Sequence, residues 1–157
     1  MNFRSLCVIA AMLFLAACQS SPQSGANAGG TAASASAAAP GSREDFVQNV
    51  GDRVFFDFDK SNIKPEGEQT LQRQAAWLKK YANMKVTVEG HCDDRGTREY
   101  NLALGARRAN AVKRALVALG IDANRITTIS YGKERPAVIG DNEAAWAQNR
   151  RGVTVVQ

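Results

Sequence analysis

Four aspartates fall near the ends of two apolar segments that read as neighbouring strands. Asp57 and Asp59 belong to the first segment, and Asp93 and Asp94 follow the second. Grouped carboxylates can hydrolyse a glycosidic bond when one of them stays protonated and its counterpart lies at a set distance. Arginines crowd the same region, at positions 95, 98, 107 and 108, and they favour ionised carboxylates that hold a ligand. Ligand binding is therefore the favoured chemistry, and hydrolysis is the alternative.

The segment 90–97 joins the second of these strands to a helix. Its glycine-flanked turn places backbone N–H groups at a helix N-terminus, which favours an anion. Arg108 lies about two helical turns further on, and helical side chains lean toward their own N-terminus, so it can reach back to this loop. Such a pocket suits a zwitterion: Arg108 holds a carboxylate, while Asp93 and Asp59 accept from an ammonium group. An internal ion pair between Asp93 and Arg108 is an equally favoured alternative.

His91 is the only histidine of the chain and precedes Cys92, which superficially suggests a nucleophile or a metal site. Adjacent residues of an extended chain point to opposite sides, and structural metal sites use spaced ligands. We therefore expect His91 to be structural and Cys92 to be a buried, unreactive thiol, with a redox or metal role as the weaker alternative. No catalytic residue, metal or cofactor is predicted.

The N-terminal residues 1–17 have the features of a signal peptide. Arg4 precedes an apolar run, 6–15, that is too short for a permanent membrane helix. The run ends in Leu15-Ala16-Ala17-Cys18, which resembles the lipobox of bacterial lipoproteins, so Cys18 is the predicted lipidation site. The alternative is an ordinary secretory signal cut after Ala17.

Gln19 follows the lipidation site where an aspartate would favour the inner membrane. By resemblance to that sorting rule, we expect a lipid anchor in the outer membrane and a domain that faces the periplasm. The chain carries a formal net charge of +5. Export nevertheless excludes nucleic acid as a partner.

Composition divides the mature chain into two parts. Residues 18–42 are mostly Ala, Ser, Gly, Gln and Pro and cannot bury enough apolar surface to offset their chain entropy, so they form a flexible linker after the lipidated cysteine. Residues 43–157 contain enough large apolar residues for one core and form a single domain.

Two periodicities predict the elements of this domain. Alternation or short apolar runs predict strands at 54–58, 86–88, 126–131 and 152–156. Helical spacing predicts a helix from Pro65 to 81–83 and a short helical turn at 143–148. The resulting order, β-α-β-α-β-(α)-β, implies an α/β sandwich with a small sheet covered by helices.

A second long helix follows the loop that carries the aspartates and ends at Gly120. Its apolar stripe, which we expect to face the core, consists of Leu102, Gly105, Ala109, Val112, Leu116 and Leu119.

Several ordered motifs carry a family resemblance. They are Phe56-Asp57-Phe58-Asp59, Val88-Glu89-Gly90-His91-Cys92-Asp93, Tyr100-Asn101, Arg107-Arg108-Ala109-Asn110-Ala111-Val112 and Asn149-Arg150-Arg151. Together they resemble the OmpA-like peptidoglycan-binding domains, whose fold is a small mixed sheet covered by two main helices. Cys92 departs from the family, which usually has a small or hydroxyl residue at this position.

The resemblance implies a protein that is not an enzyme and that grips the zwitterionic end of meso-diaminopimelate in the peptidoglycan stem peptide. Its implied binding residues are Phe58, Asp59, Asp93, Thr97, Leu104 and Arg108. It also implies Tol-system partners, chiefly TolB, on a surface that overlaps the peptidoglycan site.

With the lipid at Cys18, the predicted function is a tether between the outer membrane and the cell wall that serves envelope integrity and cell division. Two alternatives are an envelope hydrolase that uses the acidic cluster and an assembly module that mainly recruits Tol proteins.

Overall fold

The structure is a computed structural model that describes residues 38–157. The predicted signal peptide, the lipidated Cys18 and the linker as far as residue 37 lie outside the described residues. Among residues 38–157, no helix combines the length and the apolar composition needed to cross a membrane.

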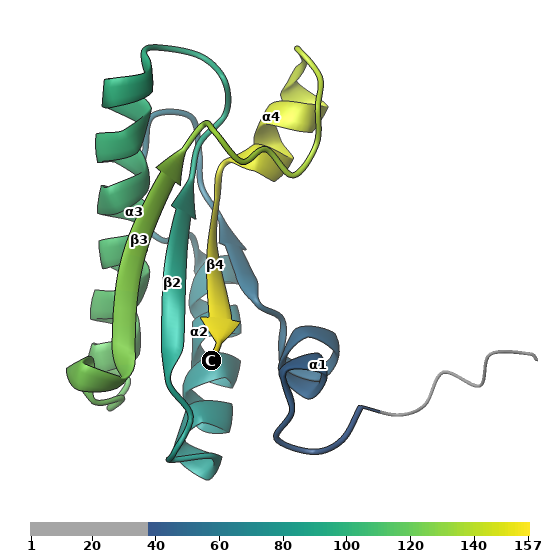
Figure 1. Cartoon of the computed structure of the whole chain (residues 1–157), viewed down its shortest axis with the longest axis vertical. Helices are drawn as coiled ribbons and strands as arrows, with labels where there is room; N and C mark the ends of the chain where they lie inside the picture. Colours follow the sequence, from purple (N-terminus) through teal and green to yellow (C-terminus); the bar gives the residue numbers. More distant parts are fainter. Residues whose placement is uncertain (1–37) are drawn as a thin grey trace, which may run out of the picture. The chain divides into compact units, whose positions relative to one another are not determined.

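Four strands form one mixed sheet in the order β1-β4-β2-β3 (Figure 1). Their bounds are β1 Arg53–Phe55, β2 Val86–His91, β3 Ile126–Gly132 and β4 Arg151–Val156. Strands β2 and β3 pair in parallel, and β4 runs antiparallel to both of its neighbours. The predicted mixed sheet and the predicted element order are confirmed.

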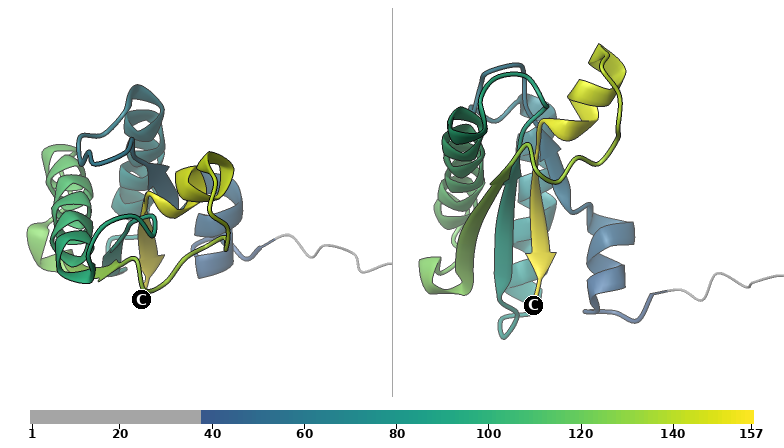
Figure 2. Two further views of the ribbon diagram at one scale, coloured as in Figure 1. Left: turned by 90° about the horizontal axis from the view of Figure 1, so that it is seen from above. Right: turned by 45° about the horizontal axis from the view of Figure 1, so that its top comes forward.

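Two long helices, α2 (Pro65–Lys80) and α3 (Arg98–Ala118), cover the same face of this sheet (Figures 1 and 2). Both lie close to their predicted bounds. Helix α4 (Glu143–Asn149) is the predicted short helical turn, and it is capped by Asn142, whose side chain accepts a hydrogen bond from the Ala145 N–H.

An N-terminal turn precedes β1 and was not predicted from the sequence. It consists of α1 (Arg43–Asp45) and a π-helical turn (Phe46–Val50). Phe46 is fully buried and packs edge-on against Trp77, with 4.9 Å between the ring centroids.

The hydrophobic core lies between the sheet and helices α2 and α3. Val86 and Val88 point inward from β2, as the alternating burial of that strand requires. The helices contribute residues at helical spacing, and the buried set from both sides includes Val54, Leu71, Leu78, Val112, Leu116 and Val156. Burying one such side chain contributes about 1.5–3 kcal/mol relative to leaving it exposed.

Two apolar residues that the sequence predicted to be buried are exposed, so these two predictions are wrong. Phe58 is not on the buried face of a strand, because β1 ends at Phe55 and the chain turns after Phe56, leaving the Phe58 side chain 56% exposed. Leu102 is 50% exposed, and Leu104 is buried instead, because the surface of α3 that meets the sheet is rotated from the predicted one in its first turns. From Gly105 to Leu116 the predicted stripe is confirmed.

Glycines allow α3 to approach the end of β2 closely. A Cβ atom on Gly90 would lie 1.8 Å from the carbonyl oxygen of Gly105, so neither backbone leaves room for a side chain. This approach brings Arg108, one turn further along α3, directly under the loop that follows β2.

Candidate functional site

Two buried arginines fix the loop that follows β1. The Arg108 guanidinium donates to the carbonyl oxygens of Lys60 (Nε, 2.9 Å), Asp57 (Nη2, 3.0 Å) and His91 (Nη1, 2.8 Å). Arg150 donates through Nε to the Phe56 carbonyl at 3.1 Å. Backbone groups that would otherwise be orphaned in a turn are thus satisfied by side chains from α3 and from the end of α4.

This loop exposes Phe58 and Asp59, at its tip, to solvent. Asp59 has a left-handed backbone conformation (φ 55°), which aspartate tolerates better than most residues. The Tyr100 hydroxyl donates a hydrogen bond to the Asp59 carboxylate, and this bond raises the pKa of Tyr100. The tip is therefore positioned from below by arginines and from the side by a residue of α3.

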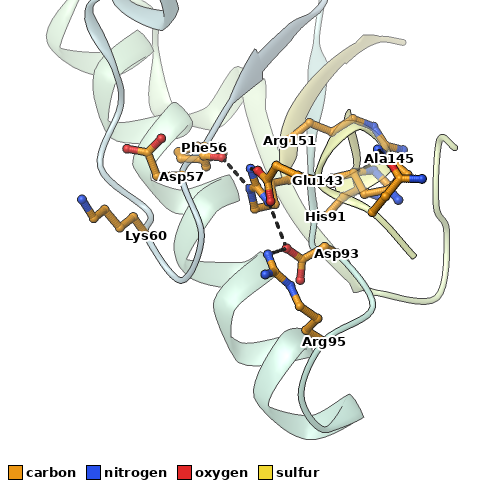
Figure 3. Close-up of polar contacts among 12 residues, drawn as sticks. Phe56, Asp57, Lys60, His91, Asp93, Arg95, Glu143, Ala145 and Arg151 are labelled. Carbon is orange, nitrogen blue, oxygen red and sulfur yellow. Dashed lines mark hydrogen bonds and ion pairs between the residues drawn. The ribbon is translucent and has the colours of Figure 1, made fainter. Parts of the chain in front are cut away.

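Asp93 follows β2 and is 4% exposed. Its Oδ2 atom accepts from Arg95 Nη2 at 2.6 Å and from Arg150 Nη1 at 3.3 Å (Figure 3). Arg150 also donates to Glu143, and this hydrogen bond lowers the pKa of the Glu143 carboxyl.

The alternative prediction of an internal Asp93–Arg108 ion pair is wrong. The partners of Asp93 are Arg95 and Arg150, because backbone carbonyls already accept from each nitrogen of the Arg108 side chain.

Arg95 is held differently from the two buried arginines. Its guanidinium carbon lies 3.9 Å from the centre of the Phe58 ring and 4.0 Å from that of the Trp146 ring. Arg95 therefore makes cation–π contacts with two aromatic rings. Figure 3 shows Arg95 and Asp93 pointing toward each other.

These side chains line a cavity of about 160 Å³ at the end of the sheet, beside the start of α3. Its lining residues are Phe58, Asp59, Asp93, Arg95, Gly96, Tyr100, Asn101, Leu104 and Arg108. Five of the six predicted peptidoglycan-binding residues therefore lie around one cavity.

Thr97 is the predicted binding residue that does not line this cavity. It caps α3, where its side-chain oxygen accepts from the Tyr100 N–H at 3.2 Å. A ligand-binding role for any of the six stays a prediction.

Only two of the four aspartates belong to the cavity. The Asp57 side chain lies near Lys64, with 3.5 Å between Oδ1 and Nζ. Asp94 is exposed, and its carbonyl oxygen accepts from the side chain of Lys133 at 2.9 Å. The predicted cluster of four carboxylates is thus reduced to Asp59 and Asp93, because Asp57 and Asp94 do not line the cavity.

His91 and Cys92 are both buried. The His91 Nε2 atom lies 3.3 Å from Glu89 Oε2, its ring packs 5.5 Å from that of Tyr131, and burial together with the charge of Arg151 lowers the pKa of the imidazole. The Cys92 thiol donates to the Asn101 carbonyl at 3.3 Å, and burial raises its pKa. Among residues 38–157, no three His, Cys, Asp or Glu side chains are grouped as metal ligands would be.

The cavity offers both an acceptor and donors to a ligand. Within residues 38–157, nothing donates to Asp93 Oδ1, although Oδ2 of the same carboxylate accepts twice. The Arg108 guanidinium carries more N–H donors than its three carbonyl contacts use. An ammonium group of a ligand matches Asp93 Oδ1, and a carboxylate of the ligand matches the free N–H donors of Arg108.

Sequence reasoning missed Trp146 and gave Arg150 and Tyr100 no role beyond their place in the family motifs, whereas it expected Arg95 only as one of several arginines that keep the carboxylates ionised. The Asn149-Arg150-Arg151 motif, which carries part of the family resemblance, is the signal that could have pointed to Arg150. Trp146 carried no such signal.

Comparison with known proteins adds three findings. The model of the OmpA family matches residues 55–150. The peptidoglycan-associated lipoprotein of Rhizobium meliloti (strain 1021) is 54% identical over 144 residues, which cover 92% of this chain and 82% of that protein. The protein of the same name from Haemophilus influenzae (strain ATCC 51907 / DSM 11121 / KW20 / Rd) is 45% identical over 150 residues, which cover 96% of this chain and 95% of that protein.

A solved structure is also similar. The crystal structure of the peptidoglycan-associated lipoprotein from Burkholderia pseudomallei superposes with a TM-score of 0.69 at 40% identity. The match covers 74% of this chain and all of the crystallised chain.

Proposed function

The chain belongs to the OmpA family, with the peptidoglycan-associated lipoproteins as its relatives, and from this premise we propose that its cavity binds the stem peptide of peptidoglycan. The recognised group is the zwitterionic end of meso-diaminopimelate. Asp93, aided by Asp59, accepts from the ammonium group, and Arg108 donates to the carboxylate. Phe58 and Leu104 line the site, and Thr97 fixes the start of α3 beside it.

The observation that carries this proposal is the pairing of opposite charges in one cavity. Asp93 keeps an oxygen without a donor, and Arg108 keeps unused N–H donors although it is 1% exposed. The two opposite charges belong together, because a buried charge without a partner is costly.

Binding without catalysis is the favoured form of this activity. A glycosidase needs one carboxylic acid that donates a proton. Asp93 Oδ2 instead accepts from two guanidinium groups, which makes it an acceptor rather than a proton donor. We therefore propose no turnover.

In the cell, we propose that lipid at Cys18 anchors the chain in the outer membrane, that residues 18–42 serve as the linker, and that residues 43–157 reach the cell wall in the periplasm. The chain then tethers the membrane to the wall during growth and division. TolB and other Tol proteins are the proposed protein partners, on a surface that overlaps the cavity.

The test is co-sedimentation of the chain with purified sacculi, with and without free meso-diaminopimelate as a competitor. Asp59→Asn is the informative variant, because asparagine tolerates the left-handed conformation while it removes the charge. We expect retention to fall by about 10-fold. Asp57→Asn is the matched control, since Asp57 lies on the same loop but its side chain is outside the cavity.

Equal retention of Asp59→Asn and Asp57→Asn, or retention that free meso-diaminopimelate does not reduce, would contradict this assignment. Release of soluble wall fragments that depends on Asp93 would instead favour the hydrolase.

A further inference from the structure

Arg95 differs from the two buried arginines, Arg108 and Arg150, in how little fixes it. Its guanidinium makes one hydrogen bond, to Asp93, and otherwise contacts the Phe58 and Trp146 rings. Its side chain is 31% exposed, and its Nε atom is buried with no hydrogen-bond partner among residues 38–157. Aromatic faces hold a cation near a plane but leave it free to slide within that plane.

Arg95 already places a positive charge against Asp93 in the free protein. A ligand ammonium group that approaches Asp93 meets a carboxylate which Arg95 and Arg150 have already neutralised. Arg150 cannot withdraw, because it is 6% exposed and also bonds to Phe56 and Glu143. Arg95 can, because losing a single hydrogen bond frees its guanidinium.

An amine without a neighbouring carboxylate therefore gains little from this cavity. It adds a third positive charge around Asp93 and gives a displaced Arg95 no new acceptor. A zwitterion brings its own carboxylate, so Arg95 can exchange one carboxylate for another while it stays in contact with the two rings.

We propose that Arg95 is the specificity-determining residue of the cavity: in the free protein it neutralises Asp93 through Oδ2, and in the complex, where the ligand ammonium binds at Oδ1, it turns to the ligand carboxylate beside Arg108. This inference rests on the proposed function. It adds that recognition requires both charges on one carbon, and that Phe58 and Trp146 are the rings along which Arg95 moves.

The test compares two soluble tripeptides, L-Ala-γ-D-Glu-meso-diaminopimelate and L-Ala-γ-D-Glu-L-Lys, by isothermal titration with the full chain. The second peptide keeps the ammonium group but lacks the adjoining carboxylate. The wild-type chain is expected to prefer the first peptide by at least about 10-fold. In Arg95→Gln, affinity for the first falls by about 10-fold, while affinity for the second stays equal or rises, so the preference disappears.

Arg98→Gln is the matched control, because Arg98 is 73% exposed, pairs with Glu134 and does not line the cavity. It is expected to keep the wild-type preference. Arg95→Lys keeps the charge but loses the planar group, and circular dichroism checks that both Arg95 variants fold. The peptide preference of Arg95→Lys is expected to be intermediate, and this variant decides the question if Arg95→Gln does not fold.

Parallel loss of affinity for both peptides in the Arg95 variants would overturn the inference, since it is the result expected if Arg95 only supports Asp93. An unchanged preference would overturn it too. Failure of the proposed function looks different, because the wild-type chain would then bind neither peptide.

Discussion

The two buried arginines beneath the cavity, Arg108 and Arg150, which we call its floor, and Arg95 at its rim use the same side chain in opposite ways; of the floor pair, Arg108 lines the cavity itself. On the floor, Arg108 and Arg150 are almost fully buried, and each guanidinium donates three hydrogen bonds. On the rim, Arg95 is partly exposed and donates one. The number of donors that buried acceptors satisfy separates an arginine that holds the fold together from one that can change partners.

This contrast also explains how the loop after β1 carries functional residues without regular structure. Its carbonyl oxygens at Phe56, Asp57 and Lys60 accept from the floor arginines, so its tip is fixed although it pairs with no strand. Loops positioned by a rigid scaffold are where binding residues are commonly found.

The largest expected effect is that of Arg150→Ala. This substitution leaves Asp93 without its buried partner and the Phe56 carbonyl without a donor. We expect it to lower the free energy of unfolding by about 3–5 kcal/mol in urea titrations followed by circular dichroism. Arg114→Ala, on the exposed surface of α3, is the control and should stay within about 0.5 kcal/mol of wild type. A loss no larger than the control's would mean that the floor is not a structural unit.

Arg108→Lys should have a smaller but still substantial effect. A lysine keeps the charge, but its compact ammonium cannot reach three carbonyls that a planar guanidinium spans. We expect a loss of about 2–3 kcal/mol in the same titration and faster amide exchange in the loop 56–60. If loop exchange is unchanged, the three hydrogen bonds do not fix that loop.

The fold could be predicted largely from the sequence because its periodicities are strong. The spacing of Leu71, Ala75 and Leu78 on α2 and the alternation of Val86 and Val88 on β2 reflect burial against a single core. The same alternation misled at Phe58, since apolar residues continue past the point where β1 stops pairing with β4. Alternation reports which residues are apolar, whereas the end of a strand is decided by its partner.

The cavity could be predicted only in outline. Asp93 and Arg108 were expected to lie together because a strand, a loop and a helix follow one another without interruption. Arg150 lies 57 residues from Asp93, and no local spacing rule reaches that far. Its burial depends on the order β1-β4-β2, which brings the start of β4 beside the end of β2.

On the rim, Arg95→Ala should hardly change stability. Its ion pair with Asp93 is partly exposed and its stacking contacts replace contacts with water. We expect the free energy of unfolding to change by less than about 1 kcal/mol, measured beside Arg150→Ala under identical conditions. A loss of unfolding free energy comparable to that of Arg150→Ala would mean that Arg95 supports the fold as the floor arginines do, and the distinction between rim and floor would fail.

The smallest expected effect is on the pH dependence of the free energy of unfolding. It tests whether the His91 ring is coupled to the two floor arginines. The carbonyl of His91 belongs to the floor because it accepts from Arg108, whereas its imidazole lies among Glu89, Tyr131 and Arg151. Burial, followed by the charge of Arg151, lowers the pKa of His91 below its ordinary value of 6.5. Between the lowered pKa and 6.5, the unfolded chain binds a proton that the folded chain does not.

Stability should therefore fall as the pH drops through 6.5 toward the pKa of the folded state. Urea titrations between about pH 5 and 7.5 measure this slope, and His91→Gln should flatten it, since the chain has no other histidine. Sacculus retention by the folded protein should stay constant over the same range, because the titrating ring does not line the cavity. Retention that follows the His91 titration would show that the floor and the ring respond as one unit.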